Sequence, residues 1–243
     1  AIDWDATSGW TKTNLEDAIY IWDHSSQSFM SYVDGVGTNG GSNIVPATQA
    51  FFVKVEDSKS YGAVSMTGDV MVFDYTTPFR NGKKGNVARL VVDNEGFQDE
   101  TVIRFKKGTT NNYDKRSDAY KVFSDKAMVP QLYTRTGDVK YSINSYPSLT
   151  ENMEVPLSLE IWNTGSHEIK LDLENFEAPV RVILEDLKEG ETHDLMVAPY
   201  QFFADVNDDP DRFVVHFIGQ PSINQEENAT SISDGSEKSS EEI

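Results

Sequence analysis

The feature that most constrains this chain is a run in which apolar and charged residues alternate one by one. Over residues 167–176, Ile169, Leu171 and Leu173 alternate with Glu, Lys and Asp residues. A period of two sends successive side chains to opposite faces of an extended chain. The pattern therefore predicts a β-strand with one dry and one wet face, and residues 180–185 repeat it.

Strand signals of the same kind recur along most of the chain. Further candidate strands lie at residues 64–75, 87–93, 101–106, 132–136, 139–145, 155–162, 194–204 and 212–218. Short strands separated by Gly, Asn, Asp and Pro are typical of an antiparallel β-sandwich or a jelly roll. Residues 13–18 and 117–123 offer single helical turns, but no amphipathic helix of ten or more residues is evident. We therefore expect an all-β fold.

The composition divides the chain into three regions. Residues 1–58 are rich in Trp and Gly and predict an irregular β region, the C-terminal part of a larger unit. Residues 59–220 carry the sandwich pattern, with a subdomain boundary near residue 129 as an open alternative. Residues 221–243 are dominated by Ser, Asn and Glu, which cannot bury enough apolar surface to offset chain entropy. This last region predicts an acidic, flexible linker or tail.

The charge balance excludes several classes of partner. The chain has 40 acidic and 21 basic residues, a net charge of −19, and no cysteine. Nucleic acids and anionic membranes both require clustered Lys and Arg, so neither is expected as a partner. No stretch approaches the roughly 20 apolar residues that span a bilayer, so we expect no membrane insertion. The absence of cysteine excludes disulfide frameworks, cysteine-ligated zinc and thiol catalysis.

Several strings occur in a characteristic order. They lie at residues 1–5, 9–11, 18–23, 32–41, 44–54, 99–105, 112–114, 118–123 and 207–217. Together they resemble a β-rich module of large secreted proteins of Bacteroidota, which precedes the C-terminal sorting domain recognised by the type IX secretion system. The resemblance covers about residues 1–218.

This resemblance implies an address and a fold, and it carries no agreed activity. It implies a secreted, cell-surface location, with the type IX secretion machinery as a partner through the parent protein. The segment that usually precedes the first string, and the sorting domain that usually follows the last, are not found in the sequence. We therefore expect a processed or excised piece of a longer protein.

One acidic loop is a candidate calcium site. Asp205, Asn207, Asp209 and Asp211 place several oxygen-bearing side chains within seven residues, and Ca²⁺ prefers such hard ligands. The spacing departs from an EF-hand, which needs Gly at its sixth position and Glu at its twelfth. Asp and Asn also commonly cap the backbone of solvated turns, which is the alternative here. A second acid-rich loop at residues 111–118 has the same two interpretations.

The tryptophans are candidates for ligand contact. Trp4, Trp10 and Trp22 fall within one short window, and with Trp162 and the tyrosines they could form a platform on which sugar rings stack. The alternative, which we favour, is that these large aromatics are buried and hold an irregular, Gly-rich region together.

The histidines carry no catalytic signature. His24, His167, His193 and His216 lie far apart, without helical metal-site spacing and without a Gly-x-Ser-x-Gly elbow. We therefore expect a non-catalytic structural or adhesive module of a secreted surface protein, with a surface glycan or protein as partner. The alternatives left open are a carbohydrate-binding module of an adhesin, a hydrolase domain, and assembly into a polymer through open sheet edges.

Overall fold

The computed structural model describes residues 1–73, 85–176 and 179–219, and all regular structure there except one short turn is β. The expected tail at residues 221–243 lies outside the described residues, as does the end of the strand expected at 64–75. Within the described part there is no α-helix, only the 3₁₀ turn η1 (Gly68–Val70). The described residues contain no helix that is long and apolar enough to cross a membrane. The all-β prediction is confirmed.

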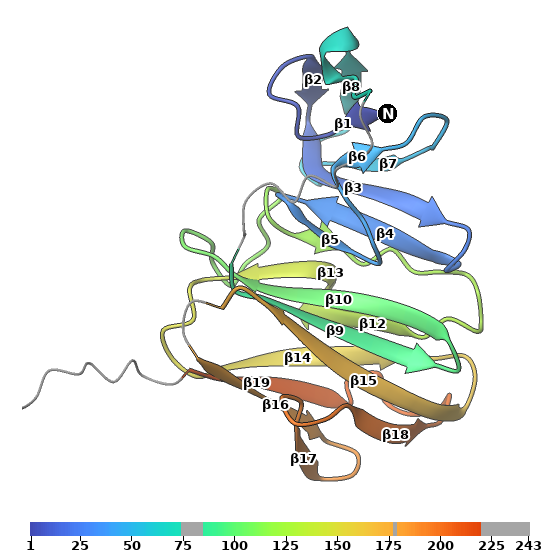
Figure 1. The fold of residues 1–243 in the computed structure, drawn as a ribbon, viewed down its shortest axis with the longest axis vertical. Coiled ribbons are helices and arrows are strands. Elements are labelled where there is room, and N and C mark those ends of the chain that lie inside the picture. Colours follow the sequence, from blue (N-terminus) through green and yellow to red (C-terminus); the bar gives the residue numbers. More distant parts are fainter. Residues whose placement is uncertain (74–84, 177–178, 220–243) are drawn as a thin grey trace, which may run out of the picture.

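The strands form one large sheet and three small ones (Figure 1). The large sheet holds β9 (Val87–Asn94), β10 (Phe97–Phe105), β11 (Ala119–Tyr120), β12 (Gln131–Thr136), β13 (Val139–Tyr146), β14 (Met153–Glu160), β15 (Gly165–Glu174), β16 (Val180–Asp186), β17 (Glu191–Asp194), β18 (Tyr200–Ala204) and β19 (Phe213–Gly219). A four-stranded sheet holds β3 (Leu15–Asp23), β4 (Ser28–Val33), β5 (Val36–Thr38) and β7 (Phe52–Val55). Two pairs complete the fold, β1 (Ile2–Asp3) with β6 (Ile44–Val45) and β2 (Trp10–Thr13) with β8 (Ala63–Met66).

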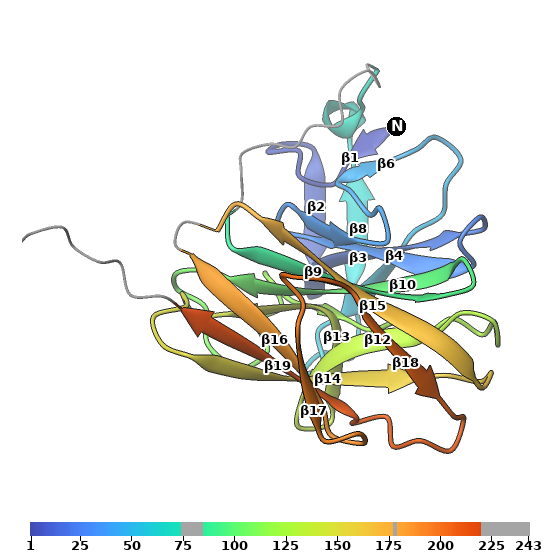
Figure 2. The ribbon, with the colours of Figure 1, turned by 60° about the horizontal axis from the view of Figure 1, so that its bottom comes forward.

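The large sheet corrects the expected sandwich in two respects. Its order is β17-β16-β19-β14-β12-β13-β10-β9-β15-β18, with β11 added on β13, and it curls until its two ends nearly close into a barrel (Figure 2). One continuous sheet thus replaces the two separate sheets of a sandwich. Strands β10 and β13 run parallel, from Val102 opposite Ile143 to Phe105 opposite Tyr146, so the sheet is mixed and not purely antiparallel. Alternation reports which face of a strand is buried and is silent on which strands pair.

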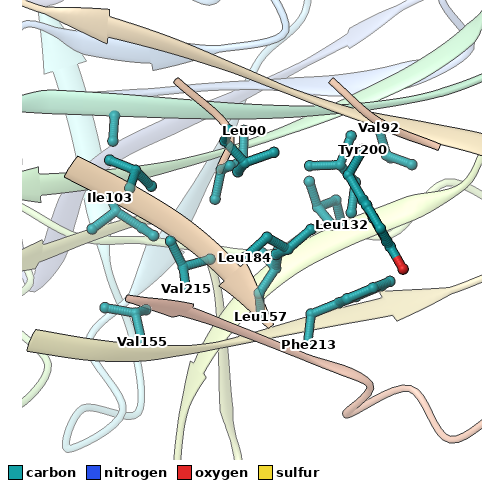
Figure 3. Packing of buried hydrophobic residues seen from close by; sticks show 14 of the residues in the cluster. Leu90, Val92, Ile103, Leu132, Val155, Leu157, Leu184, Tyr200, Phe213 and Val215 are labelled. Atoms are coloured by element: carbon teal, nitrogen blue, oxygen red, sulfur yellow. The ribbon is translucent and has the colours of Figure 1, made fainter. Parts of the chain in front are cut away.

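The interior of the curled sheet is filled by the inner cluster (Figure 3). Leu90 and Val92 come from β9, Leu184 from β16, and Phe213 and Val215 from β19. Side chains from both halves of the sheet order therefore meet in one core, and this packing holds the curled sheet together.

Two further clusters join the small sheets to the large one. The middle cluster packs Ala18, Tyr20, Val33 and Val36 of the four-stranded sheet against side chains of the large sheet. Its members from the large-sheet side are Val87, Val102, Ala119 and Ile143. The outer cluster packs the far face of the four-stranded sheet against the N-terminal strands. Its buried members are Trp4, Ile19, Ile21, Tyr32 and Val45.

Strand β3 lies between these clusters and is buried on both faces. Ala18 and Tyr20 face the middle cluster, whereas Ile19 and Ile21 face the outer cluster. The helical turn expected at residues 13–18 is therefore wrong, because this segment belongs to β2 and β3. The turn expected at 117–123 is also wrong, since Ala119 and Tyr120 form β11. In both segments burial between layers overrides a local preference worth a fraction of a kilocalorie per residue.

Polar contacts reinforce the seam between the four-stranded sheet and the large sheet. The Arg104 guanidinium donates to the Asp34 carboxylate at 2.8 Å, and the Ser142 hydroxyl donates to that of Ser31 at 3.0 Å. The backbone N–H of Tyr120 donates to the Tyr20 hydroxyl at 2.9 Å. Because these contacts lie around a shared apolar core, the two sheets form one mechanical unit.

Candidate functional site

A pocket of about 320 Å³ opens where two connections of the large sheet meet. Gly165 at the start of β15 lies opposite Ala204 at the end of β18, so the connection before β15 and the one after β18 leave the same end of the sheet. These connections are residues 161–164 and 205–212. Binding sites on loops held by a rigid scaffold are common, because loops vary without disturbing the core.

Hydrogen bonds fix the two connections to each other. The Thr164 hydroxyl donates to the Asp205 carboxylate at 3.2 Å and accepts from the backbone N–H of Val206 at the same distance. The second connection is also held to β14, where the backbone N–H of Leu159 donates to the Pro210 carbonyl at 2.9 Å. The pocket is therefore preformed, which reduces the ordering cost of binding.

Trp162 stands on the rim of this pocket and differs from the other tryptophans. Its side chain is 44% exposed, and of the residues described, none makes a ring contact or hydrogen bond with its indole. Large aromatics normally bury most of their surface, and a buried indole N–H normally finds an acceptor. The Trp162 indole is thus exposed beside a cavity and has no ring contact or hydrogen bond within the described part of the chain.

The basic residue of the pocket is committed to the fold. Arg212 is buried and holds the Asp186 carboxylate through two hydrogen bonds, Nε to Oδ1 at 2.8 Å and Nη2 to Oδ2 at 2.6 Å. Its Nη1 donates to the Phe203 carbonyl and to Asp208. Burial disfavours the charge of Arg212, but the bonded carboxylates outweigh this and raise its pKa. Arg212 is therefore fixed in the lining of the pocket. Its N–H groups are largely occupied by these acceptors, so it has little capacity to bind an anion.

The acidic residues of the pocket fall into two groups. Glu160 pairs with Lys140 at 2.7 Å, and Asp208 pairs with Lys188 at 2.8 Å. Asp205 and Asp209 line the same pocket, and the ion pairs found among the described residues leave both without a cation. The pocket therefore presents hydrogen-bond acceptors and an excess of negative charge.

The ionised form of Asp205 is stabilised by its own turn. Its Oδ1 accepts from the Asn207 backbone N–H at 2.9 Å and from the Asn207 side-chain amide at 2.7 Å. These bonds, the backbone one foremost, lower the pKa of Asp205 below its usual value. Asp205 is accordingly a carboxylate at any pH near neutrality.

The four candidate calcium ligands form hydrogen bonds and ion pairs with different partners. Asp205 and Asn207 bond to each other, and Asp209 accepts from the backbone N–H of Asp211 at 3.0 Å. Asp211 turns away toward the barrel wall, where it pairs with Arg135 at 2.6 Å and accepts from the Ser158 hydroxyl at 2.7 Å. Within residues 1–73, 85–176 and 179–219, no three acidic or histidine side chains group so as to hold a metal ion. The observed bonds are those of a hydrogen-bonded turn.

The tryptophans of the predicted platform, Trp4, Trp10 and Trp22, lie in two separate places. Trp4 is buried, donates its indole N–H to the Asp17 carbonyl at 2.7 Å, and lies 4.9 Å from the ring of Trp10. Trp10 donates to the Asp3 carbonyl at 2.8 Å. Trp22 packs edge-on against Phe29 at 5.1 Å, apart from that pair. Trp4 and Trp10 thus hold the outer layer together.

A second, more open pocket lies beside the acid-rich loop at residues 111–118. It is lined by Glu16 and Tyr113, among others. Burial is the main cause that raises the pKa of the Tyr113 phenol, and the nearby Glu16 carboxylate adds to it. Glu16 also pairs with Lys54 at 2.8 Å. The Oε2 atom of Glu16 and the Tyr113 hydroxyl are buried without a hydrogen-bond partner among the described residues, and the Tyr113 ring packs against Tyr120 and Tyr141. The loop's Asp118 accepts from the backbone N–H groups of Asp114 and Ser145.

A family model matches residues 1–217, which covers nearly every described residue. The chain belongs to this family, a domain of unknown function (DUF8693). No curated protein and no solved structure matches the chain. The DUF8693 match includes both connections that form the Trp162 pocket, so the pocket is part of the domain itself.

Trp162 could have been singled out from the sequence only if the strand ends and the strand pairing had been known. The sequence prediction gave it less weight than Trp4, Trp10 and Trp22, and it is the last residue of the strand expected at 155–162. The distinguishing fact is that β14 ends at Glu160, so Trp162 falls in the connection and not in the strand.

Proposed function

We propose that this DUF8693 domain is a non-catalytic adhesive module of a secreted cell-surface protein, carried to the surface by type IX secretion. A stiff body that presents a contact surface at one end is what such a module requires. The order of sequence strings that resembles Bacteroidota secreted proteins supports the location and the route.

The observation that carries the proposal is the continuous stack of layers. The inner, middle and outer clusters follow one another, and β3 and β10 each contribute to two of them. Ile103 and Phe105 of β10 enter the inner cluster, while Val102 enters the middle one. A strand packed into two cores transmits load between layers, because close-packed interiors have low compressibility and transmit strain.

The surface charge supports the extracellular role. A net charge of −19 keeps the domain soluble and resists self-association at a crowded surface. Attachment would then be made by the loops at the end of the sheet that carries Trp162.

Immunogold labelling of the source organism tests the address. We expect the native parent protein on the cell surface, and its loss from the surface in a strain whose type IX translocon is deleted. Surface display that is unchanged in that strain would refute the proposed route. Forced unfolding of the tethered chain tests stiffness, and separate low-force steps for the N-terminal layers would refute a single load-bearing unit.

A further inference from the structure

We propose that the pocket beside Trp162 binds a neutral or amino-bearing pyranose ring of a glycan. The inference rests on the proposed adhesive function and names the ligand class of its contact surface. It follows from three properties of the pocket, namely an open aromatic face, an acceptor-only polar lining and a preformed shape.

The aromatic face selects a flat apolar surface. The Trp162 indole is exposed, and Ile161 and Val206 extend the apolar rim beside it. The C–H bonds on one face of a pyranose carry small positive partial charges and lie flat on the negative face of an aromatic ring. Few other polar, water-soluble biological groups offer such a face together with hydroxyl groups at its edge.

The polar lining selects a hydrogen-bond donor. Asp205 and Asp209 contribute carboxylates, whereas the guanidinium of Arg212 already bonds Asp186, Asp208 and the Phe203 carbonyl. Sugar hydroxyls donate readily to carboxylates, and charge-assisted bonds of this kind are stronger than neutral ones. A protonated amino sugar adds attraction to both the carboxylates and the indole face. A uronic or sialic acid brings a like charge and is excluded.

The geometry separates this pocket from the other candidate surfaces. The pocket at Glu16 and Tyr113 offers no free aromatic face, because the Tyr113 ring packs against Tyr120 and Tyr141. The exposed side chains of Val64, Met66 and Met71 gather near the N-terminal strands, and nothing in the structure indicates what covers them. The pocket beside Trp162 alone among these three combines a cavity with an aromatic side chain that the fold leaves free.

NMR titration of the intact chain tests the inference. The indole N–H resonance of Trp162, assigned by its absence from Trp162→Phe, is followed during addition of methyl glucoside, glucosamine or glucuronic acid. We expect this resonance to shift with dissociation constants of about 1 mM for glucosamine and somewhat weaker for methyl glucoside, as is usual for a ligand of one ring. Glucuronic acid is expected to leave it unchanged.

Variants divide the pocket into its stacking and charge contributions. Binding to the Trp162 variants is followed by the backbone amide resonance of Val206, because they lack the indole signal. Trp162→Ala is expected to weaken binding of both sugars about tenfold, and Trp162→Phe to restore part of the loss. Asp209→Asn keeps the acceptor for the Asp211 N–H and is expected to weaken glucosamine about threefold and methyl glucoside less than that. Tyr61→Ala is the matched control, because Tyr61 is an exposed aromatic distant in sequence and outside the pocket lining. Unchanged circular dichroism confirms that each variant is folded.

The failure of the inference is distinguishable from failure of the proposed function. No shift of the Trp162 resonance with methyl glucoside or glucosamine, or equal binding of glucuronic acid, would overturn the sugar assignment. A shift with trilysine but not with the sugars would overturn it in favour of a basic peptide and leave the adhesive role standing. Surface display that persists without the type IX translocon concerns the proposed function alone.

Discussion

The ammonium group of Lys121 is hydrogen-bonded to the carboxylate of Asp99 in a site from which water is excluded. Their side chains are 3% and 0% exposed. Asp99 also accepts from the backbone N–H of Leu132 at 2.7 Å and from the Asn39 side-chain amide at 3.0 Å. The Asp99 carboxylate of β10 therefore binds Leu132 of β12, Lys121 just after β11 and Asn39 just after β5. These bonds tie the four-stranded sheet to the large one.

Removal of Lys121 is expected to be strongly destabilising. Lys121→Met leaves the Asp99 charge buried without a cation, and breaking such a pair costs about 3–5 kcal/mol. The free energy of unfolding from urea denaturation measures this loss. Lys126→Met is the matched control, since Lys126 pairs with Asp125 on the surface and is expected to change stability by less than about 1 kcal/mol. Equal effects of the two variants would contradict the assignment.

Arg104 is expected to hold the four-stranded sheet in place. Arg104→Ala removes the partly buried hydrogen bonds to Asp34 and is expected to cost about 2 kcal/mol. Hydrogen exchange should then accelerate in β4 and β5 more than in β16 and β19. Lys106→Ala removes a more exposed partner of the same Asp34 carboxylate, so its effect should be smaller. Uniform acceleration across all strands would argue against a local role.

Asp118 is expected to make the domain more stable as the pH falls toward 4. Burial is the main cause that raises the pKa of Asp118 to about 6. The folded state then holds a proton more tightly than the unfolded state does, so the contribution of this group to stability grows between about pH 6 and 4, by up to about 3 kcal/mol. Titration of the Asp118 carboxyl carbon by NMR checks this, and a midpoint below 4 would contradict it.

Asp186 is expected to act in the opposite sense. Burial disfavours its charge, but hydrogen bonds from Arg212 and Tyr200 outweigh burial and lower its pKa below the usual value. Its stabilising contribution is therefore fully present above the unfolded-state pKa and is lost as the pH falls through the lower, folded-state pKa. The same NMR titration should show the Asp186 carboxyl ionised where Asp118 is still protonated. Coincident titration of the two carboxyls would contradict both assignments.

Trp162 is expected to dominate the quenchable fluorescence. Acrylamide reaches an exposed indole and not one enclosed like Trp4, which is 2% exposed. Trp162→Phe should therefore remove most of the quenching at low acrylamide, whereas Trp4→Phe should leave it. Equal quenching in the two variants would show that the rim of the pocket is closed in solution.

The sequence predicted the strands of the barrel wall well because each has one face toward the inner cluster. The strand expected at 167–176 is β15, displaced by two residues, and that expected at 180–185 is β16. The single strand expected at 194–204 is divided in the structure, since β17 ends at Asp194 and β18 begins at Tyr200. Here the Asp194 side chain accepts from the Met196 backbone N–H and turns the chain.

Features that depend on neighbours were not predictable from one chain. Strand β3 has both faces buried, so its alternation is hidden and its early acidic residues look like a helix start. The parallel pairing of β10 with β13 joins segments whose partners no local pattern specifies. For the same reason Trp162 could not be told apart from Trp4, since exposure is decided by which layers close over a side chain.

Strands enclosed from both sides also indicate where the family can change over evolutionary time. A substitution in β3 or β10 must suit two cores at once, so we expect DUF8693 members to share these segments closely. The connections at residues 161–164 and 205–212 contribute only Ile161 to the packing of a core and Arg212 to a buried ion pair, so we expect their other positions to diversify more freely. Different members would then keep one frame of shared strands while varying the loops at one end of the sheet.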